Sequence, residues 1–262
     1  MMNRFKLIKT FIRKSFQQEL AFRFNFLVNI LNTLLALAGG IGGLSIIFSN
    51  QETINGWRFS QTLALLGVYL IVQAIKNLVI GPSLNALAGM GGELWTGRFD
   101  FTLLKPIPTQ FYVSVRNWSL WSLFDLLIGL GILLGSLLSL QISLSQVVLF
   151  FLSMAVSLTL VYAILLALGS AAFWYLGTPL LWIFDSMIQV ARFPIGIYPG
   201  FLRQVLTWVI PAGLIVTMPA EALFGKVGAY ELIGGAFLAA LLFFAASWFF
   251  RFSVKRYASA SS

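Results

Sequence analysis

The sequence has 262 residues, of which 59% are hydrophobic and 10% are charged, and its mean hydropathy is +0.92. Soluble domains carry about 25% charged residues, so this composition excludes a large soluble fold and favours an all-α integral membrane protein. The absence of cysteine and histidine excludes disulfides, thiolate chemistry and the usual catalytic triads, so we expect neither enzyme activity nor a metal site. The net charge of +9 is expected to act on anionic lipid rather than on nucleic acid.

The N-terminal segment combines basic residues with an apolar stripe of helical spacing. Phe5, Ile8, Ile12 and Phe16 recur at three- and four-residue steps, with Lys and Arg between them. This pattern predicts an amphipathic helix over residues 3–20 that lies in the membrane interface. The alternative is a basic tail that orients the first span and whose periodicity arises by chance. No cleavage site follows a short apolar core, so we expect no removable signal peptide.

Six apolar segments are candidates for membrane spans, which need about 20 residues each. They cover residues 26–48, 59–80, 118–140, 147–174, 180–190 and 232–250. The second segment contains a single charge, Lys76, whose long side chain we expect to reach back to the interface. The fifth segment is short in its apolar part.

Two carboxylates interrupt these apolar segments, Asp125 in the third and Asp185 in the fifth. Acids within a membrane are costly, so they are usually paired or functional. As functional groups, they would form a proton or cation relay. As structural groups, Asp125 would cap a helix or pair near the interface, and Asp185 would pair with a neighbouring span or with Arg192, seven residues later.

Residues 193–226 are apolar but rich in proline, with Pro194, Pro199, Pro211 and Pro219, and they include Arg203. Proline removes a backbone donor and breaks regular helices. The segment is also too short for two spans. It predicts a re-entrant hairpin on the outer side, whose irregular backbone is buried against protein or lines a water-filled cavity. A single additional span is the alternative, and it would place the C-terminus outside.

Lysine and arginine are concentrated before the first span, after the second and after the last. The positive-inside rule therefore predicts that both termini and residues 81–116 are cytoplasmic. Within that segment, a short charged run extends from Glu93 to Pro106, while the flanking stretches carry few charges. No internal repeat or linker divides the chain, so we expect one domain over residues 1–262.

Two stretches of the sequence resemble one family of transporters. They read Glu93-x-x-x-Gly97-x-x-Asp100-x-x-Leu103-Leu104-x-Pro106 and Phe193-Pro-Ile-Gly-Ile-Tyr-Pro199. In order and spacing, they are similar to permeases of ABC type-2 transporters, in a group of paired, largely uncharacterised bacterial components. The resemblance implies a subunit of an exporter in the bacterial inner membrane, which forms half of the translocation path.

The resemblance also implies partners. The chain lacks the Gly-x-x-x-x-Gly-Lys-Ser/Thr phosphate-binding loop, so we expect no cofactor in it. ATP and Mg²⁺ are expected on a separate ATPase subunit, present in two copies, and a second permease is expected, like or unlike, with an unlike one favoured. By position, residues 83–92 are expected to form a short coupling helix, with residues 93–106 packed against it. The expected coupling residues are Ser83, Leu84, Leu87, Met90, Glu93, Gly97, Arg98, Asp100, Lys105 and Pro106.

Other interpretations stay open. The charged residues between Glu93 and Lys105 would have a purely structural role if they form local ion pairs that fold a loop. At the level of the whole chain, the leading hypothesis is a permease subunit that exports an amphipathic or lipid-linked substrate. The alternatives are a stand-alone secondary carrier or channel that uses Asp125 and Asp185, and a membrane scaffold.

Overall fold

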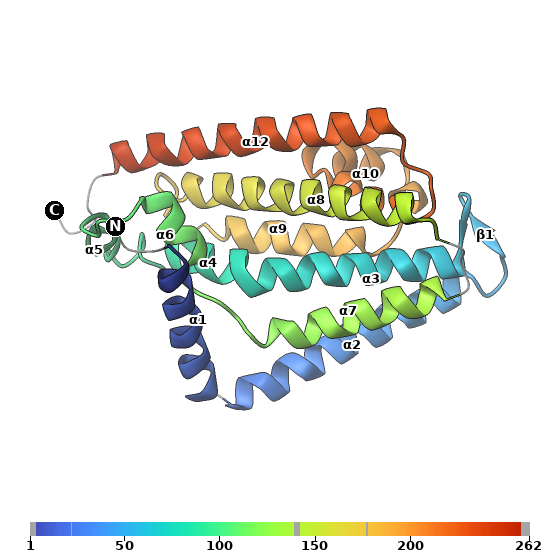
Figure 1. The fold of residues 1–262 in the computed structure, drawn as a ribbon, viewed down its shortest axis with the longest axis horizontal. Coiled ribbons are helices and arrows are strands. Elements are labelled where there is room, and N and C mark those ends of the chain that lie inside the picture. Colours follow the sequence, from blue (N-terminus) through green and yellow to red (C-terminus); the bar gives the residue numbers. More distant parts are fainter. Residues whose placement is uncertain (1–3, 22, 139–141, 177, 258–262) are drawn as a thin grey trace.

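The computed structural model describes residues 4–21, 23–138, 142–176 and 178–257. Long helices run side by side along the longest axis of the molecule, and α1 (Arg4–Ala21) crosses one end of this bundle at a steep angle (Figure 1). A two-stranded hairpin, β1 (Thr53–Ile54) with β2 (Trp57–Arg58), stands at the opposite end. We refer to these as the α1 end and the hairpin end.

Four helices are long and apolar enough to cross a membrane. They are α2 (Arg23–Ile47), the continuous helix Phe59–Ala88, α8 (Leu144–Ala171) and α12 (Ala229–Arg256). They correspond to the predicted first, second, fourth and sixth spans. The structure therefore shows an all-α membrane protein with four long apolar helices and several shorter ones.

The predicted third and fifth spans are shorter than expected. Helix α7 covers Ser122–Leu137, and α9 covers Leu180–Ile188, with a 3-10 turn (η2) over Gln189–Arg192. Residues 139 and 140 of the predicted third span, like residue 3 of the predicted interfacial helix, lie outside the described residues. The count of six spans is thus not confirmed, because sixteen and nine helical residues fall below the usual length of a span.

The second long helix contains a π-helical stretch. It consists of α3 (Phe59–Ile75), the π-helical segment η1 (Lys76–Ile80) and α4 (Gly81–Ala88). Pro82 has no N–H for the carbonyl of Leu78, which instead accepts a hydrogen bond from the N–H of Ser119 at 3.0 Å. The predicted separate helix over residues 83–92 is therefore the last part of this long helix, and it ends at Ala88.

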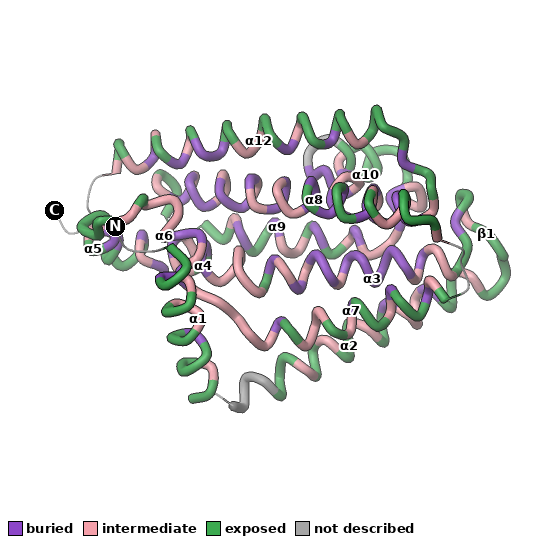
Figure 2. The backbone as a smooth tube through the Cα atoms, in the orientation of Figure 1, coloured by how far each residue is buried: buried purple, intermediate pink, exposed green. Residues whose placement is uncertain are grey.

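The core lies along α3 and α8, which carry much of the buried surface, whereas α2 and α12 expose much of theirs (Figure 2). Glycine lets α7 approach α3 closely. A Cβ atom at Gly67 would lie 2.8 Å from the backbone nitrogen of Leu133, and one at Gly129 would lie 3.0 Å from that of Ile71. Small residues at such crossings allow backbones to pack closely within a membrane.

The proline-rich segment forms a series of short helical pieces. They are η3 (Ile195–Ile197), α10 (Gly200–Gln204), η4 (Val205–Val209), η5 (Gly213–Thr217) and α11 (Met218–Leu223). Pro194 and Pro199 precede η3 and α10, Pro211 lies before η5, Pro219 lies in the first turn of α11, and Arg203 is exposed on α10.

The middle of this segment is buried. Ile215 and Val216 are fully buried, and the hydroxyl of Ser157 in α8 donates a hydrogen bond to the carbonyl of Ile215 at 2.5 Å. Irregular backbone at this position is thus packed against a long helix, as such backbone requires when it lies at membrane depth.

Helix α1 docks through residues beside the predicted stripe, in which Ile8 and Ile12 are half-buried. Leu7 and Ser15 are buried, whereas Phe5 is 82% exposed and Phe16 is 47% exposed. The hydroxyl of Ser15 accepts a hydrogen bond from the N–H of Trp118 at 3.0 Å, and the carboxylate of Glu19 accepts one from the N–H of Leu120. The docked face is therefore partly polar, because it caps free backbone N–H groups ahead of α7.

Candidate functional site

A polar cavity of about 390 Å³ lies between α2, α3, α7 and α9. It brings together Asp125, Asp185 and Arg192, the three ionisable residues that stand out in the sequence at these positions. Its other polar lining residues are Asn32, Thr33, Tyr69, Gln73, Lys76, Asn77 and Gln189. These side chains come from four segments that are distant in sequence, and most of them carry no motif that would single them out.

Lys76 and Asp185 form an ion pair in the wall of this cavity. The Nζ atom of Lys76 lies 2.5 Å from Oδ1 of Asp185, and the side chains are 5% and 35% exposed. The prediction that Lys76 reaches back to the interface is thus wrong: its side chain is buried, and a buried ammonium requires a counter-charge. Of the two partners considered for Asp185, the structure shows a neighbouring helix rather than Arg192.

Asp125 and Arg192 have no such counter-charge. Asp125, in the first turn of α7, accepts a hydrogen bond from the hydroxyl of Thr33 at 2.6 Å. Arg192 donates from Nε to the carbonyl of Gln189 at 2.9 Å and from Nη2 to its side-chain oxygen at 3.4 Å. Among the described residues, neither one has an oppositely charged side chain within 4.0 Å. The cavity therefore contains one neutralised pair and two isolated groups of opposite sign.

A second cavity of about 360 Å³ continues the first toward the α1 end. The two share Asn32, Thr33, Asn77 and Asp125, and the second extends to Asn85 on α4 and to the start of α7. We call the combined feature, from Asn85 to Arg192, the polar groove. The groove runs lengthwise along the bundle, because Asn85, Asn77 and Tyr69 succeed one another along the same long helix.

The segment between α4 and α7 forms a folded layer at the α1 end, with short helices α5 (Phe99–Leu103) and α6 (Thr109–Val115). Glu93 holds this layer together. Its carboxylate accepts hydrogen bonds from Arg116 Nη1 at 2.5 Å and from Thr102 Oγ1 at 2.7 Å, and its N–H donates to the carbonyl of Ala86 at 2.9 Å. We call residues 89–121 the end layer. The counter-charge of Glu93 thus comes from ten residues beyond the motif, not from a local pair within it.

The expected coupling residues divide into buried and exposed groups. Ser83, Leu84 and Leu87 are fully buried, so they hold α4 in the bundle and do not face outward. Met90 is 83% exposed. Four further apolar residues are exposed on the same layer, Trp95, Phe101, Leu103 and Leu104. Leu103 and Leu104 are part of the family motif, but the sequence did not place the other apolar residues on the surface of the layer. The signal that could have found them is the presence of apolar residues inside a charged segment.

The remaining motif residues form a turn of this layer, lie on its surface or begin one of its helices. Gly97 has a φ of 69°, a backbone conformation that L side chains rarely adopt, so glycine is required at this turn. Arg98 is exposed and donates from Nε to the hydroxyl of Thr96, Lys105 is exposed and contacts the hydroxyl of Tyr112, and Pro106 is exposed. Asp100 lies in the first turn of α5, where the positive end of the helix dipole stabilises a carboxylate.

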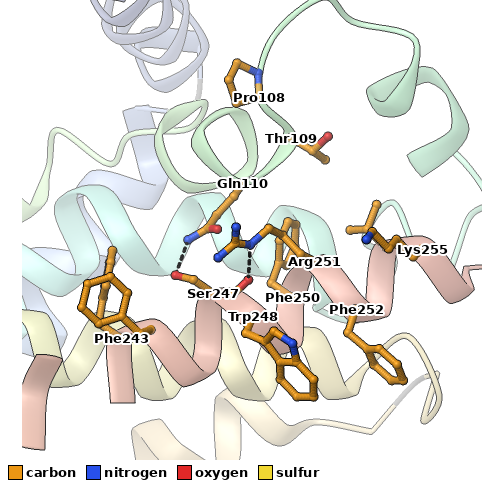
Figure 3. Close-up of a pocket in the computed structure, with 12 residues that line it drawn as sticks. Pro108, Thr109, Gln110, Phe243, Ser247, Trp248, Phe250, Arg251, Phe252 and Lys255 are labelled. Atoms are coloured by element: carbon orange, nitrogen blue, oxygen red, sulfur yellow. Dashed lines mark hydrogen bonds between the residues drawn. The ribbon is translucent and has the colours of Figure 1, made fainter. Parts of the chain in front are cut away.

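Helix α6 connects the end layer to the long helices. A pocket of about 730 Å³ opens between α6 and the last turns of α12, and it is lined by aromatic residues beside Arg251 and Lys255 (Figure 3). The side-chain amide of Gln110 donates to the hydroxyl of Ser247 at 2.9 Å, and Nε of Arg251 donates to the carbonyl of Ser247 at 3.1 Å (Figure 3). Movement of α6 would therefore act directly on α12.

The comparisons with known proteins give one finding. A family model described as "ABC-2 family transporter protein" matches residues 34–261, which include the whole end layer and every ionisable residue of the polar groove. The comparisons with curated proteins and with solved structures give no match.

Proposed function

Because the chain belongs to the ABC-2 family of transporter proteins and is a multi-pass membrane component, we propose that it forms half of the translocation path of an ATP-driven exporter. Members of this kind are typically non-catalytic, so a separate ATPase subunit would hold ATP and Mg²⁺. The observation that carries the proposal is the exposed apolar surface of the end layer, formed by Met90, Trp95, Phe101, Leu103 and Leu104. Such a patch outside the long helices is expected to be covered by another protein.

The contacts of the end layer support a coupling role for this surface. Backbone hydrogen bonds join Glu93 to Ala86 and Leu94 to Leu87, at 2.9 and 3.1 Å, so the layer is fastened to the end of the long helix. On the other side, Gln110 reaches α12. A partner that moves the layer would thus move both helices as rigid bodies, which is a common way to transmit a conformational change.

The distribution of basic residues supports an orientation in the bacterial inner membrane with the α1 end in the cytoplasm. In this orientation, both termini are cytoplasmic, and residues 193–226 form a re-entrant region at the outer side. Helix α1 would lie in the interface, with exposed Phe5 and Phe16 in contact with lipid. Two ATPase copies would bind the pair of permeases.

Helix α2 supports the presence of a second permease. Only 11% of its apolar window is buried within this chain, although it is long enough to span a membrane. Helix α9, which lines the polar groove together with α2, also exposes Trp182 and Ile183. A second permease, unlike rather than identical, would cover these faces and complete the path.

The alternative of a stand-alone carrier has weaker support. A relay through Asp125 and Asp185 needs acids that release and take up protons freely, but Asp185 is neutralised by Lys76.

Purification of the tagged chain from membranes of the cells that produce it natively tests the proposal. We expect the ATPase to co-purify in fixed stoichiometry, and the pair of substitutions Phe101→Glu and Leu104→Glu to release it. Tyr230→Glu is the matched control, since Tyr230 is 92% exposed on α12, away from the end layer. Reproducible absence of the ATPase with the unaltered chain, or full retention by the double variant, would refute the proposal.

A further inference from the structure

We propose that the polar groove binds the head group of a zwitterionic lipid, with Asp125 facing its ammonium and Arg192 its phosphate. This inference rests on the proposed function, because it names the class of molecule that the path would carry.

The groove is long enough for a head group to move along most of the thickness of the hydrocarbon core. Sixteen residues separate Asn85 from Tyr69 along one long helix, about 24 Å at 1.5 Å per residue, compared with about 30 Å for the hydrocarbon core. Lys76 lies between these two residues, so its ion pair with Asp185 sits within the groove. A polar molecule can therefore exchange lipid head-group contacts for side-chain contacts along this length.

The polar side chains of the groove exceed what the fold itself uses. The side-chain oxygen of Gln73 is buried and has no hydrogen-bond partner among the described residues. Asn32 and Asn77 are exposed at the groove surface. Unused polar groups in a membrane helix are costly unless a polar ligand or water satisfies them. Their concentration in a single concave feature points to a ligand with several donors and acceptors.

The charges along the groove favour a head group with both signs. Asp125 lies where the two cavities meet, level with Lys76 on the long helix, and Arg192 lies on η2 near Tyr69, further toward the hairpin end. The Asp125 carboxylate would repel a purely anionic head group, and the Arg192 guanidinium would repel a purely cationic one. An ammonium joined to a phosphate meets a favourable group at each position, and the Lys76–Asp185 pair in the wall of the same cavity presents both signs to it.

The walls of the groove suit an apolar tail outside it. Near Arg192 the lining changes to Ala36, Leu37, Leu66 and Leu70. Helix α2, which forms one wall, exposes Leu31 and other leucines on its outer surface. A ligand can thus keep its head group in the groove while its acyl chain stays in contact with the apolar wall and the surrounding lipid.

Binding to the purified permease–ATPase complex tests this proposal. The two probes are fluorescent lysophosphatidylethanolamine, which is zwitterionic, and lysophosphatidylglycerol with the same acyl chain, which is anionic. We expect the first to bind about tenfold more tightly, and Asp125→Asn to remove this preference by weakening the first probe alone. Arg192→Gln should weaken both probes about tenfold.

Arg203→Gln is the matched control, since Arg203 is exposed on α10 and lines neither cavity of the groove. Equal affinity of the unaltered complex for both probes, tighter binding of the anionic probe, or unchanged binding by Asp125→Asn would overturn the proposal. Asn at position 125 still accepts the hydrogen bond from Thr33, and the melting temperature of each variant reports its folding. Failure of the ATPase to co-purify would instead refute the exporter, while probe binding by the permease alone would leave the head-group site intact.

Discussion

The ammonium of Lys76 and the carboxylate of Asp185 lie 2.5 Å apart across a separation of 109 residues. The pair joins the long helix Phe59–Ala88 to the short helix α9 in the wall of the polar groove. Because α9 has only nine residues, this contact is an important anchor for its position. The two charges therefore have a structural role, because the ion pair with Lys76 holds Asp185 in the wall of the groove.

Replacing Lys76 with Met should destabilise the protein by about 3 kcal/mol, because Asp185 would lose its counter-charge while partly buried. The value lies at the low end of the range for buried pairs, since Asp185 keeps 35% exposure. Thermal unfolding in detergent measures the effect. The double change Lys76→Met with Asp185→Leu should recover most of the loss, and a double variant as unstable as the single one would contradict the pairing.

Gly67→Ala should destabilise the contact of α3 with α7. The new Cβ atom would lie 2.8 Å from the backbone nitrogen of Leu133, so the helices must separate, at a cost of about 1–3 kcal/mol. Gly131→Ala, in the partner helix α7, has no atom within 4 Å of the new Cβ and should be neutral or stabilising by about 1 kcal/mol. Equal melting temperatures for the two variants would show that the helices do not pack this closely.

Glu93→Gln should loosen the end layer. The buried guanidinium of Arg116 would lose its counter-charge, at a cost of about 2–3 kcal/mol for a charged hydrogen bond. Limited proteolysis across residues 89–121 should become faster. Arg98→Gln, which changes an exposed charge in the same layer, should alter stability by no more than about 0.5 kcal/mol. Protease resistance equal to that of the unaltered chain would show that the contacts of Glu93 do not hold the end layer in place.

The docking of α1 should depend on pH. Burial raises the pKa of Glu19, and the hydrogen bond from the N–H of Leu120 only partly offsets this effect. Because the pKa is raised in the folded state, the contribution of Glu19 to stability is greatest at low pH and is lost as pH rises through the raised pKa. Protease cleavage near the junction of α1 and α2 should therefore increase with pH in this range.

Glu19→Gln provides the control for this pH effect. The amide oxygen still accepts a hydrogen bond from Leu120 but does not titrate, so the variant should show a flatter pH dependence of cleavage. An identical pH profile for the variant and the unaltered chain would assign the effect to another group.

Several features of this protein could be predicted from sequence because they depend on local composition. Six apolar segments were predicted as membrane spans, and four of them form the long helices. The motif from Glu93 to Pro106 indicated the ABC type-2 transporters, and the family match agrees with it. The prolines of residues 193–226 predicted irregular backbone, because proline removes the donors that regular helices need.

Only the tertiary structure decided which residues meet. Helix docking at Gly67 and Gly129 sets the rotation of α3 and α7, and that rotation determines which polar side chains face the groove. Lys76 was visible as a lone charge, but its pairing with Asp185 depends on the placement of α9. In the same way, Arg116 reaches Glu93 only after the end layer folds back on α4. Composition and length decide that a helix forms, whereas contacts between distant helices decide what each charged side chain does.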